Sequence, residues 1–463
     1  MMSKPSAARA CIAAIENLWR KYAVTAKQIE DSRDQAAQDL QGIWWSWGMS
    51  EWIEAQLSQL VTFQKGRKVG TSAFAAEGFA AYLGASGIGG GNDEYASTQF
   101  AVLAKPADTL MLWDGERSGL VGFGRQGVVA STVSKLTPND CIDPQYLFFA
   151  LSDRFGWIQH RRTGTGVPHV PKDLGRILKL HYPKALSTQQ KIAAILTAAD
   201  SAIEKTEALI AKYQQIKAGL MHDLFTRGVL PSGQLRPPRS QAPELYQESA
   251  IGWIPRDWQY ELLDQLALRG SGHTPNKDHP DYWNGGIKWV SLADSYRLDQ
   301  LYISNTDLKI SHKGIQNSSA VLHPAGIVVL SRDAGVGKSA ITTEPMAVSQ
   351  HFMCWKCDQK MDNHFLYYWL QFNKRTFENI AMGSTILTIG LPYFKRLKIA
   401  CPFDLVEQQC ITSKLRALDS RLFSLRANLD KKRQKKLGLM QDLLTGKVPV
   451  TVDNAAVTME ALT

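Results

Sequence analysis

The sequence predicts an α+β fold in which two similar globular α/β domains are separated by two long helices. Three observations lead to this prediction: one long segment occurs twice, both copies have heptad spacing, and short glycine-broken strand patterns precede each copy. We expect the helices to form an antiparallel coiled coil, which gives the chain a pseudo-twofold axis. An extra N-terminal helical extension precedes the first domain.

The repeated segment is the strongest feature of the chain. It runs over Pro183–Val229 and again over Pro402–Val448, and each residue of the second copy stands 219 positions after its counterpart without a gap. The segments just upstream align at the same offset. Further back, Trp52 aligns with Trp258 at an offset of 206, so the copies differ there by a net 13 residues (219 − 206). The repeat therefore covers a whole domain and the helix that follows it.

Each repeated segment is predicted to be one long helix. Apolar residues at steps of three and four bury a narrow stripe against another helix. Ser187 with Gln190, and Asp404 with Glu407, are capping-box patterns that predict the two helix starts. Antiparallel pairing is favoured because the linker then needs no return along the helix. The seam residues are Ile192, Leu196, Ile203, Ile210, Tyr213 and Leu220 in the first helix and Ile411, Leu415, Leu418, Leu422, Leu425 and Leu429 in the second.

Seven parts follow one another along the chain. They are an N-terminal helical extension (1–50), a first globular domain (51–185), a first central helix (186–226), a linker (227–251), a second globular domain (252–403), a second central helix (404–445) and a C-terminal tail (446–463). The linker is rich in proline, glycine and arginine, which predicts an extended connector. The N-terminal extension is interpreted either as a helix that covers an exposed core or as a docking element for a partner.

Within the domains, short apolar runs predict strands and longer periodic runs predict helices. The predicted strands are Ala101–Leu103, Thr109–Trp113, Gly127–Val133, Ile287–Ser291, Gly326–Leu330 and Ala347–Phe352, and the predicted helices are Pro144–Asp153, Phe155–Arg161 and Asp362–Phe372.

The composition narrows the class of partner and the compartment. A net charge of +10 and a pI of about 9.2 favour an anionic partner, either nucleic acid or a membrane surface. No run of about twenty apolar residues predicts a membrane span, and charged residues interrupt any signal peptide. Six cysteines without a leader indicate free thiols and the cytoplasm. The lone CxxC at Cys354 and Cys357 is interpreted as buried strand cysteines rather than a metal site.

No motif in the sequence predicts catalysis by this chain. The segment Arg332–Ser339 ends like a phosphate-binding loop, but arginine stands where the first glycine is required. Asp281 with Asp307 and Lys309 form a loose nuclease pattern whose carboxylates could hold Mg²⁺. That pattern is short and frequent by chance. Hydrolase, metalloprotease and methyltransferase signatures are not found, so we expect no catalytic residue and no bound metal.

Basic and polar loop residues of the two domains are the remaining candidates for a binding surface. Arginine and lysine neutralise phosphates, and arginine, asparagine or histidine can hydrogen-bond base edges. The DNA-binding candidates are Lys65, Arg67, Lys68, Arg117, Arg125, Arg161, Arg162 and Lys172 in the first domain and Arg269, His273, Asn276, Lys277, Arg332, Lys338, Lys395 and Arg396 in the second.

With these features the chain resembles the specificity (S) subunit of type I restriction–modification systems over roughly residues 52–448. The resemblance rests on the shared QQ-I-L-D-GLM-DL-T pattern of both central helices and on the motifs that precede them, Leu174–Pro183 and Phe394–Pro402. Ile254–Trp258 and Ile287–Ser291 in the second domain are also typical of this family. The helical extension of about 50 residues departs from the family pattern, which leaves its role open.

The resemblance implies a DNA-recognition subunit of a restriction system that has no activity alone. Each target recognition domain would bind one half of a split double-stranded DNA sequence, and the coiled coil would set the spacing. Two methyltransferase subunits would dock on it and restriction subunits would join them. S-adenosylmethionine, ATP and Mg²⁺ are then expected on the partners and no cofactor on this chain. A coiled-coil protein-binding adaptor and, less favoured, a stand-alone nuclease are the alternatives.

Overall fold

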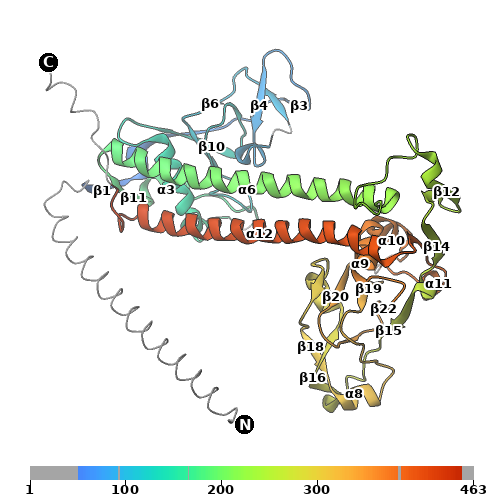
Figure 1. The fold of residues 1–463 in the computed structure, drawn as a ribbon. Coiled ribbons are helices and arrows are strands. Elements are labelled where there is room, and N and C mark those ends of the chain that lie inside the picture. Colours follow the sequence, from blue (N-terminus) through green and yellow to red (C-terminus); the bar gives the residue numbers. More distant parts are fainter. Residues whose placement is uncertain (1–50, 92–93, 165, 384–386, 451–463) are drawn as a thin grey trace, which may run out of the picture. The chain divides into compact units, whose positions relative to one another are not determined.

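The computed structural model describes residues 51–91, 94–164, 166–383 and 387–450 (Figure 1). Two compact units make up the chain: unit 1 extends to Glu204 and resumes at Asp430, and unit 2 extends from Lys205 to Leu429. Each of the two long helices therefore contributes one part to each unit. The predicted N-terminal extension (1–50) and the tail beyond residue 450 lie outside the described residues.

Unit 1 is built around a four-stranded antiparallel sheet in the order β2-β10-β7-β8. Helix α3 (Pro144–Asp153) packs against it, and Asp143 caps that helix by accepting from the amides of Gln145 and Tyr146. The strands are β2 (Val61–Lys65), β7 (Thr109–Leu112), β8 (Val121–Gly122) and β10 (Val133–Pro138). The other elements of this core are β1 (Trp52–Gln56), α2 (Leu57–Leu60), α4 (Phe155–Gln159), α5 (Leu174–Ile177) and β11 (Lys179–Pro183), with β1 paired to β11. We call these elements the frame of unit 1.

A second sheet, in the order β3-β5-β4-β9-β6, extends the frame (Figure 1). Most of its strands come from residues 66–108, between β2 and β7, which we call insert 1. The strands are β3 (Thr71–Ser72), β4 (Phe79–Leu83), β5 (Tyr95–Ser97), β6 (Leu103–Ala104) and β9 (Gly127–Val129), and the short helix η1 (Gly87–Gly89) lies among them.

Unit 2 repeats this frame, and one additional strand joins its sheet. Its sheet has the order β15-β22-β19-β20-β17. The frame elements are β14 (Trp258–Leu262), α7 (Leu263–Leu266), β15 (Ala267–Ser271), β19 (Val328–Ser331), β20 (Ser339–Thr342), β22 (Phe352–Cys357), α9 (Asn363–Phe372), α10 (Lys374–Ile380), α11 (Leu391–Lys395) and β23 (Lys398–Pro402). The fifth strand of the sheet, β17 (Tyr302–Ile303), comes from the insert between β15 and β19. The starts of β14, α7 and β15 stand 206 positions after those of β1, α2 and β2. The starts of β19, β22, α9, α10 and β23 stand 219 positions after those of β7, β10, α3, α4 and β11, and β20 and α11 begin one and two residues before that offset. The change of offset therefore lies between β15 and β19.

Insert 2 (272–327) occupies that position in unit 2. Its three-stranded sheet has the order β18-β16-β21, with β16 and β21 parallel. Its elements are η3 (Pro280–Tyr282), β16 (Trp283–Val290), η4 (Leu292–Arg297), β18 (Leu308–Ile310) and α8 (His312–Gln316), and β21 (Ala347–Val348) joins them from the frame. Insert 1 pairs β4 with β9 in the same parallel sense. The two inserts therefore share a core pairing but differ in length and covering elements.

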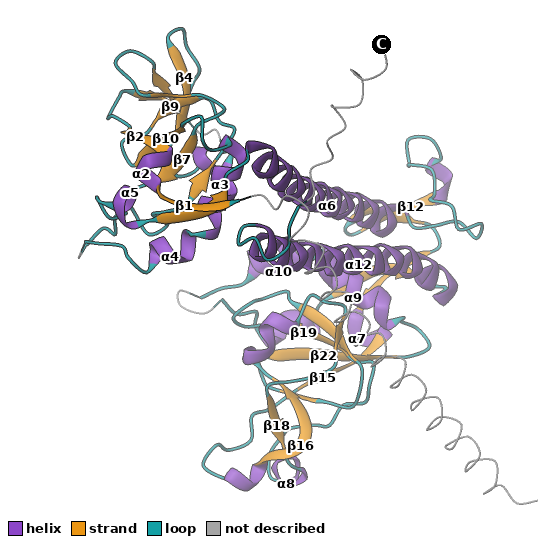
Figure 2. Cartoon of the chain, turned by 90° about the vertical axis from the view of Figure 1, so that its left-hand side faces the viewer, coloured by secondary structure: helices purple, strands orange, loops and turns teal. Residues whose placement is uncertain are grey.

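The long helices are α6 (Leu186–Arg227) and α12 (Leu405–Leu443) (Figure 2). In unit 1, Leu196 of α6 shares a hydrophobic core with Met440 of α12, and Asp200 pairs with Lys436 at 2.5 Å. In unit 2, Leu415 of α12 shares a core with Leu224 of α6. As the residue numbers rise along α6, the numbers of the facing residues fall along α12. The predicted antiparallel pairing of the helices is confirmed in each unit.

The predicted seam residues are all at least half-buried. Ile192, Leu196, Ile210, Ile411, Leu415, Leu422, Leu425 and Leu429 are buried, and Ile203, Tyr213, Leu220 and Leu418 are intermediate. The capping boxes are only partly as predicted. Asp404 accepts from the Val406 amide at 2.9 Å, but Ser187 lies inside α6, which already begins at Leu186.

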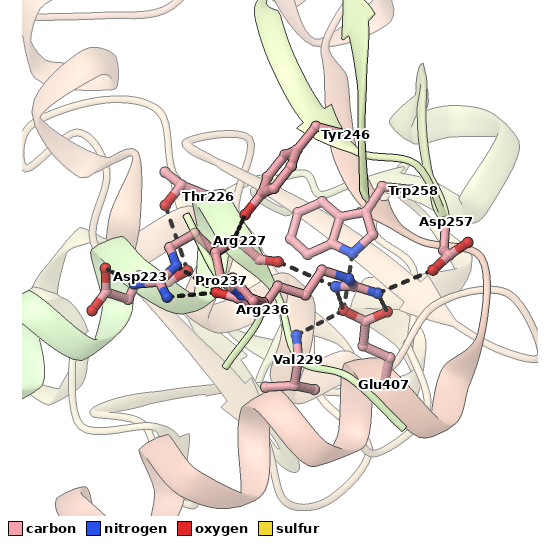
Figure 3. A network of polar contacts seen from close by, with 10 residues as sticks. All are labelled: Asp223, Thr226, Arg227, Val229, Arg236, Pro237, Tyr246, Asp257, Trp258 and Glu407. Atoms are coloured by element: carbon pink, nitrogen blue, oxygen red, sulfur yellow. Dashed lines mark hydrogen bonds and ion pairs between the residues drawn. The ribbon is translucent and has the colours of Figure 1, made fainter. Parts of the chain in front are cut away.

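The prediction of an extended linker is wrong, because this segment folds onto unit 2 (Figure 3). Arg236 is 2% exposed, and its two terminal nitrogens donate to both oxygens of Glu407 at 2.5 and 2.9 Å. The Trp258 indole and the Val229 amide also donate to Glu407, each at 3.0 Å. The segment continues as η2 (Pro243–Leu245) and the hairpin of β12 (Tyr246–Ser249) with β13 (Gly252–Pro255). Composition indicated turns correctly but contained no sign of this buried ion pair.

No helix among the described residues is long and apolar enough to cross a membrane.

Candidate nucleic-acid interface

Three loops of unit 1 come together at one end of its frame sheet. Asp114, just after β7, forms β-bridge contacts with His169, and His169 also bridges Thr163. The Asp114 carboxylate holds the Lys65 ammonium at 3.1 Å and the His169 imidazole at 2.7 Å. The end of β2, the turn after β7 and the loop after α4 therefore form one surface, which we call face 1 (residues 65–68, 114–117, 160–164 and 166–172).

The cations of face 1 fall into two groups. Arg162 donates to the carbonyls of Gln159 and Glu116, and Arg161 stacks on the Trp157 ring at 4.0 Å, so both are held by the protein. Apart from Lys65, which pairs with Asp114, the other predicted cations are exposed and have no ion pair among the described residues. They are Arg67, Lys68, Arg117 and Lys172 on this face and Arg125 beside Gly90 of the insert. The second group can neutralise phosphates without first losing an internal partner.

The same loops meet in unit 2. Asp333 and Met382 bridge Thr388, in the positions that Asp114 and Thr163 hold relative to His169 in unit 1. Asp333 again accepts from an imidazole, that of His351, at 2.7 Å. We call this surface face 2 (residues 331–338, 381–383 and 387–390). The repeat therefore conserves a place on the fold where three loops meet, although the residues there differ.

Two predicted cations of unit 2 lie on face 2, and both are committed to protein groups. Arg332 is half-buried beside Asp333, with Nε 3.5 Å from the carboxylate. Lys338 donates to the carbonyl and hydroxyl of Ser295 at 3.2 and 3.1 Å. Arg269 is also held by a protein group, since its Nε donates to the two carboxylate oxygens of Asp264 at 2.9 and 3.0 Å. These three residues fit a structural role better than phosphate contact.

The remaining predicted residues of unit 2 lie elsewhere. His273, Asn276 and Lys277 are exposed in the loop that opens insert 2. The main-chain carbonyls of His273 and Asn276 accept from Trp289 and Trp283, which fixes the course of this loop. Lys395 and Arg396 are exposed at the end of α11. Within the described residues no hydrogen bond joins the side chain of either residue to face 2.

Exposed aromatic side chains are a feature that the sequence interpretation missed. Phe74 and Phe100 in insert 1 are both 80% exposed, and Tyr296 in insert 2 is 60% exposed. The prediction concentrated on cations because phosphate contact is the general feature of nucleic-acid binding. The signal that could have found these rings was the change of offset between the copies, which marks the inserts.

The nuclease pattern does not form a metal site. Asp281 pairs with Lys313, whereas Asp307 accepts from Arg297 at 2.6 Å and from the Tyr296 hydroxyl at 3.0 Å. The hydrogen bond from Lys313 holds the pKa of Asp281 below its ordinary value, and that from Arg297 does so for Asp307. Within the described ranges no group of three histidine, cysteine or acidic residues could hold a metal ion. The CxxC cysteines both lie on β22, and Cys354 is buried beside His323.

A family model described as "Type I restriction modification DNA specificity domain" matches the chain twice, over residues 49–214 and 255–432. The two matches correspond to the two copies of the repeat.

Curated relatives carry related names. The chain is 26% identical over 417 residues to the type I restriction enzyme MjaVIII specificity subunit of Methanocaldococcus jannaschii, which covers 86% of this chain and 93% of the relative. It is 23% identical over 332 residues to the HindI specificity subunit of Haemophilus influenzae, over 59% of this chain and 71% of the relative.

Solved structures share the fold. The S subunit of the type I restriction–modification system from M. genitalium aligns with a TM-score of 0.55 and 14% identity, over 85% of this chain and 96% of that chain. A chain from a structure on complex assembly and conformational transition of the type I R-M system aligns with a TM-score of 0.52 and 13% identity, over 87% of this chain and 100% of that one.

Proposed function

The chain belongs to the type I restriction modification DNA specificity family, and on that premise we propose how its two units divide the recognition of DNA. Unit 1 reads one half of a split double-stranded target and unit 2 reads the other half. The observation that carries this proposal is the recurrence of the frame together with two unlike inserts. A repeated scaffold suits the same task performed twice, and unlike surfaces suit two different sequences.

Phosphate contact and base reading are assigned to different parts of each unit. Phosphate contacts position a protein on DNA and base contacts supply specificity. The unpaired cations of face 1, such as Arg67 and Arg117, are suited to phosphates because they are exposed. The inserts are suited to base reading because their sheets and covering elements differ between the units.

Partner subunits supply the chemistry in this proposal. The long helices expose apolar side chains that a partner would cover: Leu209 and Ile216 on α6, Phe423 and Leu437 on α12. Two methyltransferase subunits, one for each copy of the repeat, fit the duplicated helices, and restriction subunits join through them. S-adenosylmethionine, ATP and Mg²⁺ belong to those partners, and the assembly works on DNA in the cytoplasm. This chain then acts as the recognition subunit and performs no catalytic step.

Methylation mapping tests the proposal. The chain would be co-expressed with its methyltransferase subunit in a host without adenine methylation, and the modified DNA would be sequenced. We expect one two-part motif with a fixed gap, and binding that weakens steeply with salt as counterions are released. A stable complex that leaves DNA unmethylated and binds it without salt dependence would favour the adaptor alternative. Cleavage that requires Mg²⁺ and is lost in Asp281→Ala would favour the nuclease.

A further inference from the structure

Phe100 in insert 1 has a backbone conformation that its residue type disfavours. Its φ is +58°, in the left-handed region that bulky side chains rarely adopt. The Ala101 amide donates to the Thr98 carbonyl at 3.3 Å, which closes a four-residue turn with Phe100 at its third position. Glycine is the usual residue at a third turn position with positive φ. A phenylalanine there costs free energy that a glycine would not.

Nothing inside the described protein offsets this cost. Leu301 has a similar φ of +65°, but its amide donates to the Tyr367 hydroxyl at 3.1 Å and its side chain packs against the core of unit 2. The Phe100 side chain is 80% exposed. Asn284 and Asp299, also at positive φ, are polar types that tolerate the conformation. Among these four residues with positive φ, Phe100 is thus the one with a bulky side chain that does not pack against the protein core.

The segment that leads up to the strand before the Phe100 turn carries two basic residues. The Ser97 amide donates to the Gly70 carbonyl at 3.1 Å, so the chain from Arg67 to Gly70 runs alongside the strand that leads into the turn. Arg67 and Lys68 are exposed and have no ion pair among the described residues. The Gln99 amide donates to the Ser97 hydroxyl and stiffens the turn. The turn therefore holds an aromatic ring in solvent, and a neighbouring segment carries two exposed cations without an ion pair among the described residues. On the other side, Thr98 donates to the carbonyl of Gly78, which follows the exposed Glu77.

From this arrangement we propose that Phe100 is a specificity-determining residue of unit 1, whose ring enters a DNA groove and makes an apolar contact with a base. Arg67 and Lys68 contact the adjacent phosphates and hold the turn against the duplex. Strained backbone persists where function requires it, and apolar side chains read thymine methyl groups or wedge between base steps. The inference rests on the proposed function, because it assigns the reading of one position within one half-site to one side chain.

The test compares Phe100→Gly with Phe74→Gly in the complete complex with its methyltransferase. Both changes remove a ring that is 80% exposed from the same insert, and Phe74 lacks the positive φ. We expect Phe100→Gly to unfold at the same or a higher temperature than the wild type, since glycine relieves the turn. We also expect it to bind the target about tenfold more weakly and to tolerate any base pair at one position of one half-site. Phe74→Gly should stay within twofold of the wild type.

Equal affinity and an unchanged motif for Phe100→Gly would overturn the inference, and so would an equal loss in Phe74→Gly. A Phe100→Gly complex that loses assembly with the methyltransferase would also contradict it, because the change should leave the frame intact. If the wild-type complex itself methylates no split motif, the proposed function fails first, and that result is distinct from a failure of Phe100 alone.

Discussion

The two units have similar frames, whereas their inserts differ from each other. The frames have matching elements at constant offsets, and even small contacts recur. Gln189 and Gln408, which stand 219 positions apart, each accept from an N-cap amide and donate to a proline carbonyl in their own unit. The inserts share one parallel strand pairing and little else. The frames keep the same geometry because both position the chain on DNA. The inserts differ because each reads the bases of a different half-site.

Within the frames, the places where the two copies disagree are informative in themselves. Glu407 of unit 2 stands where unit 1 has Thr188, and Tyr368 stands where unit 1 has Phe149. Each disagreement adds a polar contact to unit 2 alone. The loss of unfolding free energy on removal of each contact measures how far the two frames are equivalent.

The largest effect is expected for Glu407→Ala. This change leaves the Arg236 guanidinium, whose side chain is 3% exposed, without its main partner, and loss of one member of a buried pair costs about 3–5 kcal/mol. Thr188→Ala in unit 1 should cost less than about 1 kcal/mol, as is usual away from such networks. Urea unfolding with hydrogen exchange of β14 and β1 measures the two units separately. Equal losses in both units would contradict the asymmetry. The double variant Glu407→Leu with Arg236→Met should recover most of the loss, because it removes both charges.

A smaller difference is expected between Asp419→Ala and Asp200→Ala. Each aspartate pairs with a lysine at 2.5 Å, Asp419 with Lys217 and Asp200 with Lys436. Asp419 also accepts from the buried Tyr368 hydroxyl at 2.7 Å, which Phe149 cannot provide in unit 1. Losing Asp419 should therefore cost about 2 kcal/mol and losing Asp200 about 1 kcal/mol, since an unsatisfied buried hydroxyl adds its own penalty.

Tyr368→Phe is the matched control for this pair, because it gives unit 2 the residue of unit 1. In that background, Asp419→Ala should cost no more than Asp200→Ala in denaturant unfolding. A cost that stays at about 2 kcal/mol would show that the hydroxyl is not the source of the difference.

The smallest effect is expected from pH. His323 packs beside Cys354 in unit 2, and burial lowers its pKa from 6.5, whereas unit 1 has Ala104 at this position. The unfolded chain binds the proton first as the pH falls, so the contribution of neutral His323 is complete above about pH 6.5 and declines as the pH falls below it. Unfolding of wild type and His323→Ala at pH 7.5 and 5.5 measures this. An equal decline in both proteins would exclude His323 as the cause.

The sequence predicted the parts of the fold that depend on local periodicity. The strand over Thr109–Trp113 appears as β7, and the helix over Pro144–Asp153 has those same bounds in the structure. Prediction failed where a contact joins residues far apart in the chain. Arg236 has the composition of a linker on both sides, and only the fold brings it to Glu407.

For the candidate site, the sequence predicted the type of residue but not which individual residues are free to contact DNA. Lysine and arginine in loops indicated phosphate contact, but nothing local distinguishes Arg67, which is free of ion pairs among the described residues, from Arg162, which the carbonyls of Gln159 and Glu116 hold. Phe100 was missed because an isolated phenylalanine in sequence predicts core. Its turn conformation and exposure are properties of the fold.

Exchange of the inserts tests the central claim most directly. That claim is that the frames position the chain on DNA and the inserts read the bases. Insert 2 (272–327) would replace insert 1 (66–108), which joins equivalent points after β2 and before β7. The complex with the methyltransferase would then be mapped by sequencing methylated DNA. We expect the half-site of unit 1 to be replaced by the half-site of unit 2, with the gap between the halves unchanged. A motif that keeps the original unit 1 half-site in a complex that still assembles would contradict the account.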